Sequence, residues 1–302
     1  MRLCDDKVVF QRLIEMASRK LNIAEQFIEK DYYAISLLKE LVKRDNDLVF
    51  KGGTSLSVCH QVINRFSEDI DVSYSLERIT TSIRKRIKYD VFIPSIDAVG
   101  LQLTNNENIR SRRIFNRYLC SYDSLWGDYK GSVVAEWATQ TPSFPIETRD
   151  AQTIIGRYLE SINRLDLVEK YDLQSFKTKT LAKERTLVDK IFAICDYHIS
   201  GVITRQSRHI YDIHQLLPFV ALDEGLIDLF LKVKGYRSLI DNCYSAKEGK
   251  MISNILLDLI DKRTYYSDYQ NRTYPLLYDH VKYEECVKSI VAIADFLKVH
   301  TL

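Results

Sequence analysis

Residues 50–56 read FKGGTSL, and residues 65–71 read RFSEDID. In the first stretch an apolar run ends in Gly52 and Gly53, so we expect a strand, a tight turn and then the start of a helix. Glycine allows a positive φ and lets a ligand approach the main chain closely. The free N–H groups at the start of a helix favour phosphate, and Thr54 or Ser55 is placed to cap that helix. These residues predict either a phosphate-binding loop or a plain turn.

The second stretch places two carboxylates one residue apart. Alternation over residues 69–74 predicts a strand on which Ile70 and Val72 face one side while Asp69 and Asp71 face the other. Two carboxylates on one face repel each other unless water or a cation separates them, and aspartate is a poor strand former. Carboxylate oxygens are the ligands that Mg²⁺ prefers. Combined with the glycine turn upstream, the pair predicts a metal site rather than a solvated strand end.

Together these residues resemble a known active-site signature. Gly-Gly-Thr followed by Asp-x-Asp is similar to the signature of the DNA polymerase β-type nucleotidyltransferases. A longer series of stretches resembles the AbiEii/AbiGii nucleotidyltransferase toxin family, which includes the MenT-type toxins. The matching stretches are EKDY at 29–32, the two quoted above, ERTLVDK at 184–190 and SRHIYD at 207–212. The chain departs from the family at Asp189, where a glutamate usually precedes the lysine.

The resemblance implies roles for residues in both halves of the chain. Asp69 and Asp71 would hold Mg²⁺ or Mn²⁺, and Lys190 would place its positive charge on the nucleotide phosphates. Asp212 would be an active-site acid, although it also follows Arg208 at the spacing of an ordinary helix salt bridge. The residues expected to be catalytic are Asp69, Asp71, Lys190 and Asp212. The residues expected to bind the nucleotide are Lys51, Gly52, Gly53, Thr54, Arg65, Ser67 and Arg208.

Glu136 is a candidate for a third metal ligand. It lies on a predicted strand at 132–138, and nucleotidyltransferases of this superfamily commonly use a third acid on a strand beside the aspartates. Ala135 and Trp137 would face the opposite side of that strand. The alternative is an acid at a strand end that pairs with an arginine, and the sequence leaves both interpretations open.

The charge of the chain is nearly balanced but unevenly distributed. The 302 residues carry a formal net charge of +2, which excludes a strongly basic nucleic-acid-binding protein. Basic residues nevertheless cluster at 84–88 and 110–113, with Arg117 close behind. The aromatic residues near these clusters are Tyr89, Phe115, Tyr118 and Tyr122. Such a mixture can hold an RNA backbone and stack its bases, and it also occurs on an ordinary solvated helix face.

We expect an α+β fold with two lobes. The predicted helices cover residues 5–20, 24–44, 76–99 with an interruption near Pro94, and 183–199. The predicted strands after the aspartates cover residues 101–103, 117–122 and 132–138. Strand signals stop at the proline-bearing stretch 141–145, and helical patterns follow. We therefore place a polymerase β-like nucleotidyltransferase lobe in residues 1–160, and a mainly helical lobe that contributes Lys190 and Asp212 to the cleft in residues 161–302.

The sequence predicts an enzyme that uses an NTP. By resemblance it is a Mg-dependent nucleotidyltransferase that moves a nucleoside monophosphate to an acceptor hydroxyl, with RNA, and tRNA 3′ ends in particular, as the expected acceptor. The resemblance also implies a toxin of a toxin–antitoxin or abortive-infection system, with a separately encoded antitoxin as its partner. Without a long apolar run or an apolar signal core, we expect a cytoplasmic protein. The alternatives are transfer to a small molecule or a protein, and a catalytically silent nucleotide-binding module.

The cysteines predict no further cofactor. Six are scattered along the chain without a Cys-x-x-Cys pair. Most have apolar neighbours, so we expect packed, reduced thiols rather than a zinc site or a disulfide framework.

Overall fold

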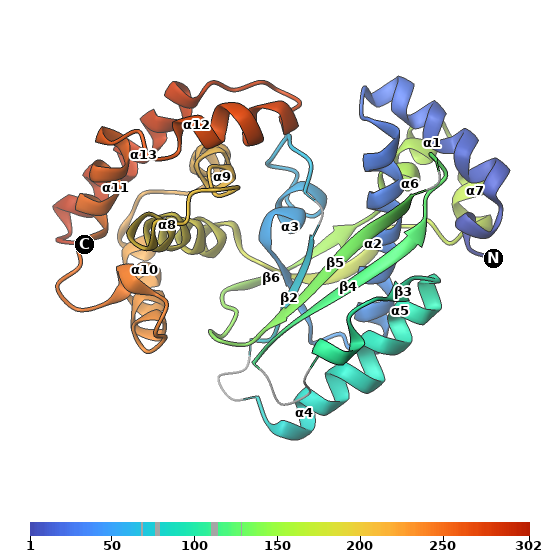
Figure 1. The fold of residues 1–302 in the computed structure, drawn as a ribbon, viewed down its shortest axis with the longest axis horizontal. Coiled ribbons are helices and arrows are strands. Elements are labelled where there is room, and N and C mark those ends of the chain that lie inside the picture. Colours follow the sequence, from blue (N-terminus) through green and yellow to red (C-terminus); the bar gives the residue numbers. More distant parts are fainter. Residues whose placement is uncertain (68, 76–78, 110–113, 128) are drawn as a thin grey trace. The chain divides into compact units, whose positions relative to one another are not determined.

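The structure is a computed structural model that describes residues 1–302 apart from 68, 76–78, 110–113 and 128 (Figure 1). The chain forms two compact units. The first comprises Met1–Cys59 and Ser67–Thr180, and the second comprises His60–Phe66 and Leu181–Leu302. Three features singled out in the sequence lie outside the described residues: Glu68, the first three residues of the helix predicted at 76–99, and the basic cluster at 110–113.

The first unit is built on a mixed β-sheet. Its described strands are β1 (Val49–Lys51), β2 (Asp69–Ser73), β3 (Gln102–Leu103), β4 (Phe115–Asp123), β5 (Lys130–Ala138), β6 (Ile146–Ala151) and β7 (Phe176–Leu181). Their order across the sheet is β3-β4-β5-β2-β1-β7-β6. β2 pairs antiparallel with β1 and parallel with β5, and β4 pairs antiparallel with β3 and β5. The strands that carry the predicted site residues are therefore neighbours at the centre of the sheet.

Helices cover one face of this sheet. The described helices of the unit are α1 (Lys7–Leu21), α2 (Glu25–Arg44), α3 (Gly52–Val58), α4 (Thr81–Arg86), α5 (Ile93–Val99), α6 (Ile154–Ser161) and α7 (Leu165–Lys170), with a π-helical turn at Ile87–Phe92. α2 packs against β5 and β2, and Figure 1 draws it behind β4 and β5. On β4, Tyr122 stacks on Tyr33 and Tyr118 stacks on Phe92, each with ring centroids 4.0 Å apart. Because side chains alternate along a strand, Cys120 shares the face of these tyrosines, whereas Leu119 and Ser121 point to the other face.

The motif at 29–32 connects the helical layer to the rest of the first unit. Glu29 on α2 accepts hydrogen bonds from the hydroxyl of Ser124 and the backbone N–H of Leu125, each at 2.8 Å. Asp31 accepts a hydrogen bond from the N–H of Ile154, the first residue of α6, at 2.6 Å. These contacts tie α2 to the loop after β4 and to the start of α6, so the motif has a structural role.

The second unit is helical. Its described helices are α8 (Lys183–Ser200), α9 (Arg208–Leu216), α10 (Glu224–Ser238), α11 (Ile252–Asp261), α12 (Tyr266–Asp268) and α13 (Tyr283–Val299). Short 3₁₀ or π segments cover Leu217–Phe219, Tyr244–Ala246, Tyr269–Thr273 and Tyr274–Leu276. α8 packs against α9, α10 and α11, and α13 packs against α9 and α11. Among the described residues, no helix has the length and apolar character that crossing a membrane requires.

A short segment from early in the chain completes the second unit. The N–H of Phe66 donates to the carbonyl of Leu276 at 3.4 Å, and the N–H of Tyr278 donates to the carbonyl of Asn64 at 2.8 Å. The N–H of Asn64 also donates to the hydroxyl of Tyr211 on α9 at 3.0 Å. Residues 60–66 are thereby held between α9 and the segment before α13, which fixes the position of Arg65.

The structure confirms most of the predicted elements and corrects two parts of the prediction. The strands expected at 69–74, 117–122 and 132–138 correspond to β2, β4 and β5. The expectation that strands stop at 141–145 is wrong, because β6 and β7 follow. β7 alternates lysine with threonine and β6 is an exposed strand at the edge of the sheet, so neither has the apolar alternation of a half-buried strand. The first compact unit continues to Thr180, beyond the residue 160 at which the sequence placed the end of the first lobe.

Candidate active site

Four charged residues form one row across the open face of the sheet. In the strand register, Lys51 on β1 lies opposite Asp71 on β2, Asp71 lies opposite Glu136 on β5, and Glu136 lies opposite Arg117 on β4. The Nε of Arg117 lies 3.2 Å from Oε1 of Glu136. Asp69 lies on the same strand two residues before Asp71 and therefore on the same face. The pairing of four strands thus gathers three carboxylates and places a cation on either side of them.

The carboxylates influence one another. Burial, followed by the charge of Asp71, raises the pKa of Glu136 to about 7, whereas Arg117 opposes that shift. This mutual repulsion is the electrostatic condition that a bound divalent cation would relieve. The oxygen donors also suit Mg²⁺ or Mn²⁺. Within the described part of the chain, no three His, Cys, Asp or Glu side chains lie close enough together to form a metal-binding group. The case for a metal at the carboxylates therefore rests on the chemistry of their oxygens and on the strand register.

Gly52 is fitted to the carboxylate of Asp71. Its φ is +80°, a conformation that favours glycine, and a Cβ built at this position would lie 2.1 Å from Oδ2 of Asp71. A side chain at residue 52 would therefore displace the central carboxylate of the row. Residues 54–68 separate the glycine turn from the Asp-x-Asp strand in sequence, yet the backbone of Gly52 lies directly against the carboxylate of Asp71.

Helix α3 starts directly at this turn. Lys51 occupies the N-cap position and makes no capping hydrogen bond with its side chain, so the expectation that Thr54 or Ser55 caps the helix is wrong. The hydroxyl of Thr54 instead donates to the backbone carbonyl of Asp69 at 2.6 Å and lies 3.1 Å from the hydroxyl of Ser67. Thr54 is 3% exposed. Thr54 and Ser67 thus fix the start of β2, and with it the aspartates, against the helix.

The second unit holds a buried cluster of three charged residues. Asp212 on α9 is fully buried and forms a bidentate pair with Arg65, with Nε–Oδ1 and Nη2–Oδ2 distances of 2.7 Å. The Nζ of Lys190 on α8 lies 2.5 Å from Oδ2 of the same carboxylate. The ion pairs of Asp212 among the described residues are thus with Arg65 and Lys190, and the alternative of a helix salt bridge with Arg208 is not among them.

This cluster sets the charges of its members. Burial alone would raise the pKa of Asp212, but the charges and hydrogen bonds of Arg65 and Lys190 hold it well below the ordinary value. Burial lowers the pKa of Lys190, and the Asp212 carboxylate opposes that shift. Asp212 therefore offsets part of the effect of burial on Lys190 and holds its Nζ in an ion pair, while the catalytic roles of both residues stay predictions.

Arg65 has a different environment from the one that the sequence suggested. The motif at residues 65–71 places Arg65 among the predicted nucleotide-binding residues. In the structure its side chain is 5% exposed, and its Nη1 donates to the carbonyl of Phe66 at 2.9 Å in addition to the two bonds to Asp212. The direct contact of Arg65 with a nucleotide stays a prediction, whereas its contact with Asp212 across 147 residues of sequence is one that no local pattern signals.

Asp268 is a second residue that sequence reasoning missed. It is buried, and its Oδ2 accepts hydrogen bonds from the N–H and the hydroxyl of Ser207 at 3.0 and 2.7 Å. Its Oδ1 accepts from the N–H of Arg205 at 2.8 Å. Asp268 therefore fixes the loop that leads into α9 and so the start of the helix that carries Asp212. No sequence signal connects it to that helix.

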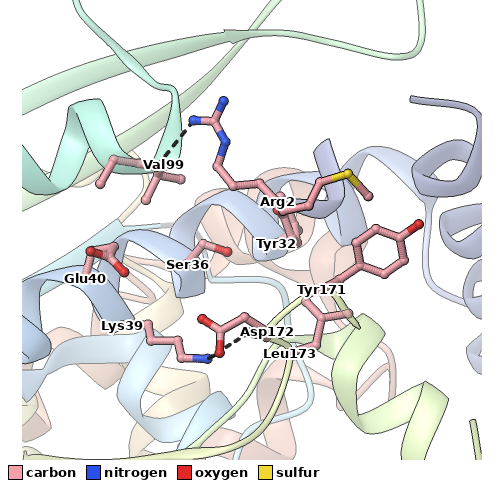
Figure 2. Close-up of a pocket in the computed structure, with 11 residues that line it drawn as sticks. Arg2, Tyr32, Ser36, Lys39, Glu40, Val99, Tyr171, Asp172 and Leu173 are labelled. Atoms are coloured by element: carbon pink, nitrogen blue, oxygen red, sulfur yellow. Dashed lines mark hydrogen bonds and ion pairs between the residues drawn. The ribbon is translucent and has the colours of Figure 1, made fainter. Parts of the chain in front are cut away.

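A pocket elsewhere in the first unit does not compete with the carboxylate row as the nucleotide site. It has a volume of about 180 Å³ and is lined by residues of α2, the end of α5, the N-terminus and residues 171–173 (Figure 2). Lys39 in this pocket is already paired with the carboxylate and the carbonyl of Asp172, at 2.9 and 2.7 Å. Pockets for ligands the size of a nucleotide usually enclose about 300 Å³ or more.

Comparisons with known proteins point to one family. Residues 36–288 match the family model described as nucleotidyl transferase AbiEii toxin, type IV TA system. Among solved structures, the chain is similar to MenT4, a nucleotidyltransferase toxin from Mycobacterium tuberculosis H37Rv, with a TM-score of 0.60 and 19% identity over 94% of this chain and 89% of that one. A candidate nucleotidyltransferase from H. pylori has a TM-score of 0.50 and 14% identity, over 92% of this chain and 97% of that one. No curated protein gives a significant match. At these identities the structural similarity supports the fold.

Proposed function

The chain belongs to the AbiEii family of nucleotidyltransferase toxins, and from this premise we propose that it transfers a nucleoside monophosphate from an NTP to the 3′ hydroxyl of an RNA, with tRNA as the favoured acceptor. The family is that of a type IV toxin–antitoxin system, so a separately encoded antitoxin is the expected protein partner. We further propose that the enzyme acts in the cytoplasm, where NTPs and tRNA are both present.

The observation that carries the proposal is the fit between Gly52, Asp71 and Glu136. The glycine backbone lies against the Asp71 carboxylate, and the register of β2 and β5 places Glu136 directly beside it. A nucleotidyltransferase needs a surface that accepts phosphates next to grouped carboxylate oxygens, because phosphoryl transfer depends on positioning and on neutralising charge. The central strands of the first unit bring these two features together.

We assign the roles of the remaining residues on the same basis. Asp69 and Asp71, with Glu136, would hold Mg²⁺ or Mn²⁺, which when bound would neutralise phosphate charge and favour ionisation of the acceptor hydroxyl. Lys51 and the glycine turn would contact the triphosphate. Lys190 would add a fixed positive charge for the phosphates, and Asp212 would hold that lysine in place.

Labelling with radioactive NTP tests the proposal. The protein is incubated with each of the four α-labelled NTPs, Mg²⁺ and total RNA, and Asp71→Asn is compared with wild type. We expect label in RNA with wild type and at least a 100-fold loss with Asp71→Asn, because one of the carboxylates at the reacting centre is lost. Asp123→Asn, on the exposed end of β4, is the matched control and should label as wild type does.

The same experiment separates the alternatives. Protein lysate and small-molecule acceptors are run beside the RNA, and label in either of them without label in RNA would replace the proposed acceptor. Calorimetry with NTP in the presence and absence of Mg²⁺ addresses a silent module, since such a module would bind NTP equally in both. Equal labelling by wild type and Asp71→Asn would refute the assignment of the carboxylates.

A further inference from the structure

The open face of the sheet exposes an unusual set of side chains on β4. Phe115 and Leu119 are 40% and 37% exposed, and the side chain of Arg117 between them is 53% exposed. Their neighbours Tyr118 and Tyr122 point to the helix-covered face, where they stack on aromatic rings. We refer to Phe115, Arg117 and Leu119 as the β4 platform. Large apolar side chains on a sheet face are normally covered, so their exposure beside the charged row indicates a binding surface.

The strand register links the platform to the carboxylates. Leu119 lies opposite Val134, which lies opposite Asp69. Arg117 lies opposite Glu136, which lies opposite Asp71. Since neighbouring strands are about 4.8 Å apart, the platform lies about 10 Å from the aspartates on the same face. Alternate residues along a strand are separated by about 7 Å, so Phe115 and Leu119 flank Arg117 at that spacing.

We propose that the β4 platform binds the single-stranded end of the acceptor RNA, with a base stacked on Phe115 and a backbone phosphate at Arg117. This inference rests on the proposed function, because it assigns the acceptor side of the same site. An acceptor hydroxyl must reach the aspartates while the bases that precede it are held nearby, and the platform lies at that distance. The carboxylates would otherwise repel an RNA backbone, and Arg117 supplies the positive charge on the acceptor side.

The chemistry of the platform favours single-stranded nucleic acid over a protein surface. Proteins that bind single strands combine aromatic side chains, on which bases stack, with cations that follow the backbone. Protein interfaces also use aromatic residues and arginine, but they are depleted in Asp and Glu, whereas the β4 platform lies beside three carboxylates. Several RNA-binding domains likewise bind RNA bases on aromatic side chains that are exposed on the face of a β-sheet.

Steady-state kinetics of Phe115→Ala test the inference. We expect the KM for the acceptor RNA to rise about ten-fold while the KM for NTP stays within two-fold of wild type, because base stacking on one aromatic ring is lost. Phe115→Trp should restore the wild-type KM. Ile146→Ala is the matched control: Ile146 is 38% exposed, on β6 at the other end of the strand order, and should leave both constants unchanged.

A binding measurement keeps this inference separate from the proposed function. Fluorescence anisotropy with a labelled single-stranded RNA oligonucleotide, without NTP, should show affinity about ten-fold weaker for Phe115→Ala than for Ile146→Ala. If wild type labels RNA but the acceptor KM of Phe115→Ala is unchanged, the platform is refuted and the function stands. If wild type labels no RNA, the proposed function fails, and equal oligonucleotide affinities of the two variants would refute the platform as well.

Discussion

Replacing Arg65 with methionine should destabilise the second unit by about 3–5 kcal/mol. Asp212 is fully buried and Arg65 is 5% exposed, so the variant leaves a buried carboxylate with Lys190 as its remaining ion-pair partner among the described residues. The two lost hydrogen bonds to Asp212 are charge-assisted, at 2.7 Å each, and such bonds contribute about 1.5–3 kcal/mol apiece. Methionine has a similar length and no charge, so the loss reflects the interaction rather than an empty cavity.

The chain offers a control with the same geometry on the surface. Arg164 makes a bidentate pair with Asp166, with Nε–Oδ1 and Nη2–Oδ2 distances of 2.8 and 2.7 Å. Its side chain is 50% exposed and that of Asp166 is 61% exposed. Solvent screens such a pair, so Arg164→Met should leave the unfolding free energy close to the wild-type value. The difference between the two variants then measures the effect of burial at constant geometry.

Urea unfolding followed by far-UV circular dichroism is the suitable assay. Both tryptophans, Trp126 and Trp137, belong to the first unit, so their fluorescence does not report on the second. Hydrogen exchange at Arg208–Leu216 gives a local measurement, and Arg65→Met should exchange faster there because α9 carries the orphaned carboxylate. Equal stability losses for Arg65→Met and Arg164→Met would refute the reasoning that burial makes this pair important.

Gly52→Ala should abolish nucleotide transfer, because the added Cβ would lie 2.1 Å from Oδ2 of Asp71. Gly201→Ala is the control: its φ is +71°, and no atom lies within 4 Å of the added Cβ, so it shares only the backbone strain. Gly201→Ala should lose about 1–2 kcal/mol in urea unfolding and Gly52→Ala at least as much, and wild-type labelling by Gly52→Ala would place Asp71 outside the reacting centre. Burial raises the pKa of Asp31 from 3.8 to about 6, so the stability that this group contributes is fully present below pH 4 and lost as the pH rises through 6. That loss amounts to about 3 kcal/mol at most. Asp31→Asn should therefore reduce the pH dependence of the unfolding free energy between pH 4 and 7. An unchanged pH dependence would show that other groups cause it.

The elements of the site were predictable because their signals are local. Alternation over residues 69–74 identified β2 and the face on which its aspartates lie, and the glycine pair after an apolar run identified the turn before α3. Glu136 could be proposed as a partner of the aspartates from its strand alone, but its position directly beside Asp71 depends on a register between strands about 65 residues apart in sequence. Residue patterns indicate which face of a strand is buried, but they do not identify the strands that pair with it in the sheet.

The sequence by itself determined the family, because the family's motifs occur in order along the chain. It also determined the glycine turn, the carboxylate strand and the helices at 183–199 and 24–44, because each of these elements depends on contacts within a few residues. The tertiary structure alone decided that Arg65 binds Asp212, that Asp31 holds the start of α6, and that β6 and β7 extend the sheet. It also decided that Phe115 and Leu119 are exposed on the carboxylate face. These features depend on segments far apart in the chain, and the free energy of such contacts comes from burial and pairing that no local pattern records.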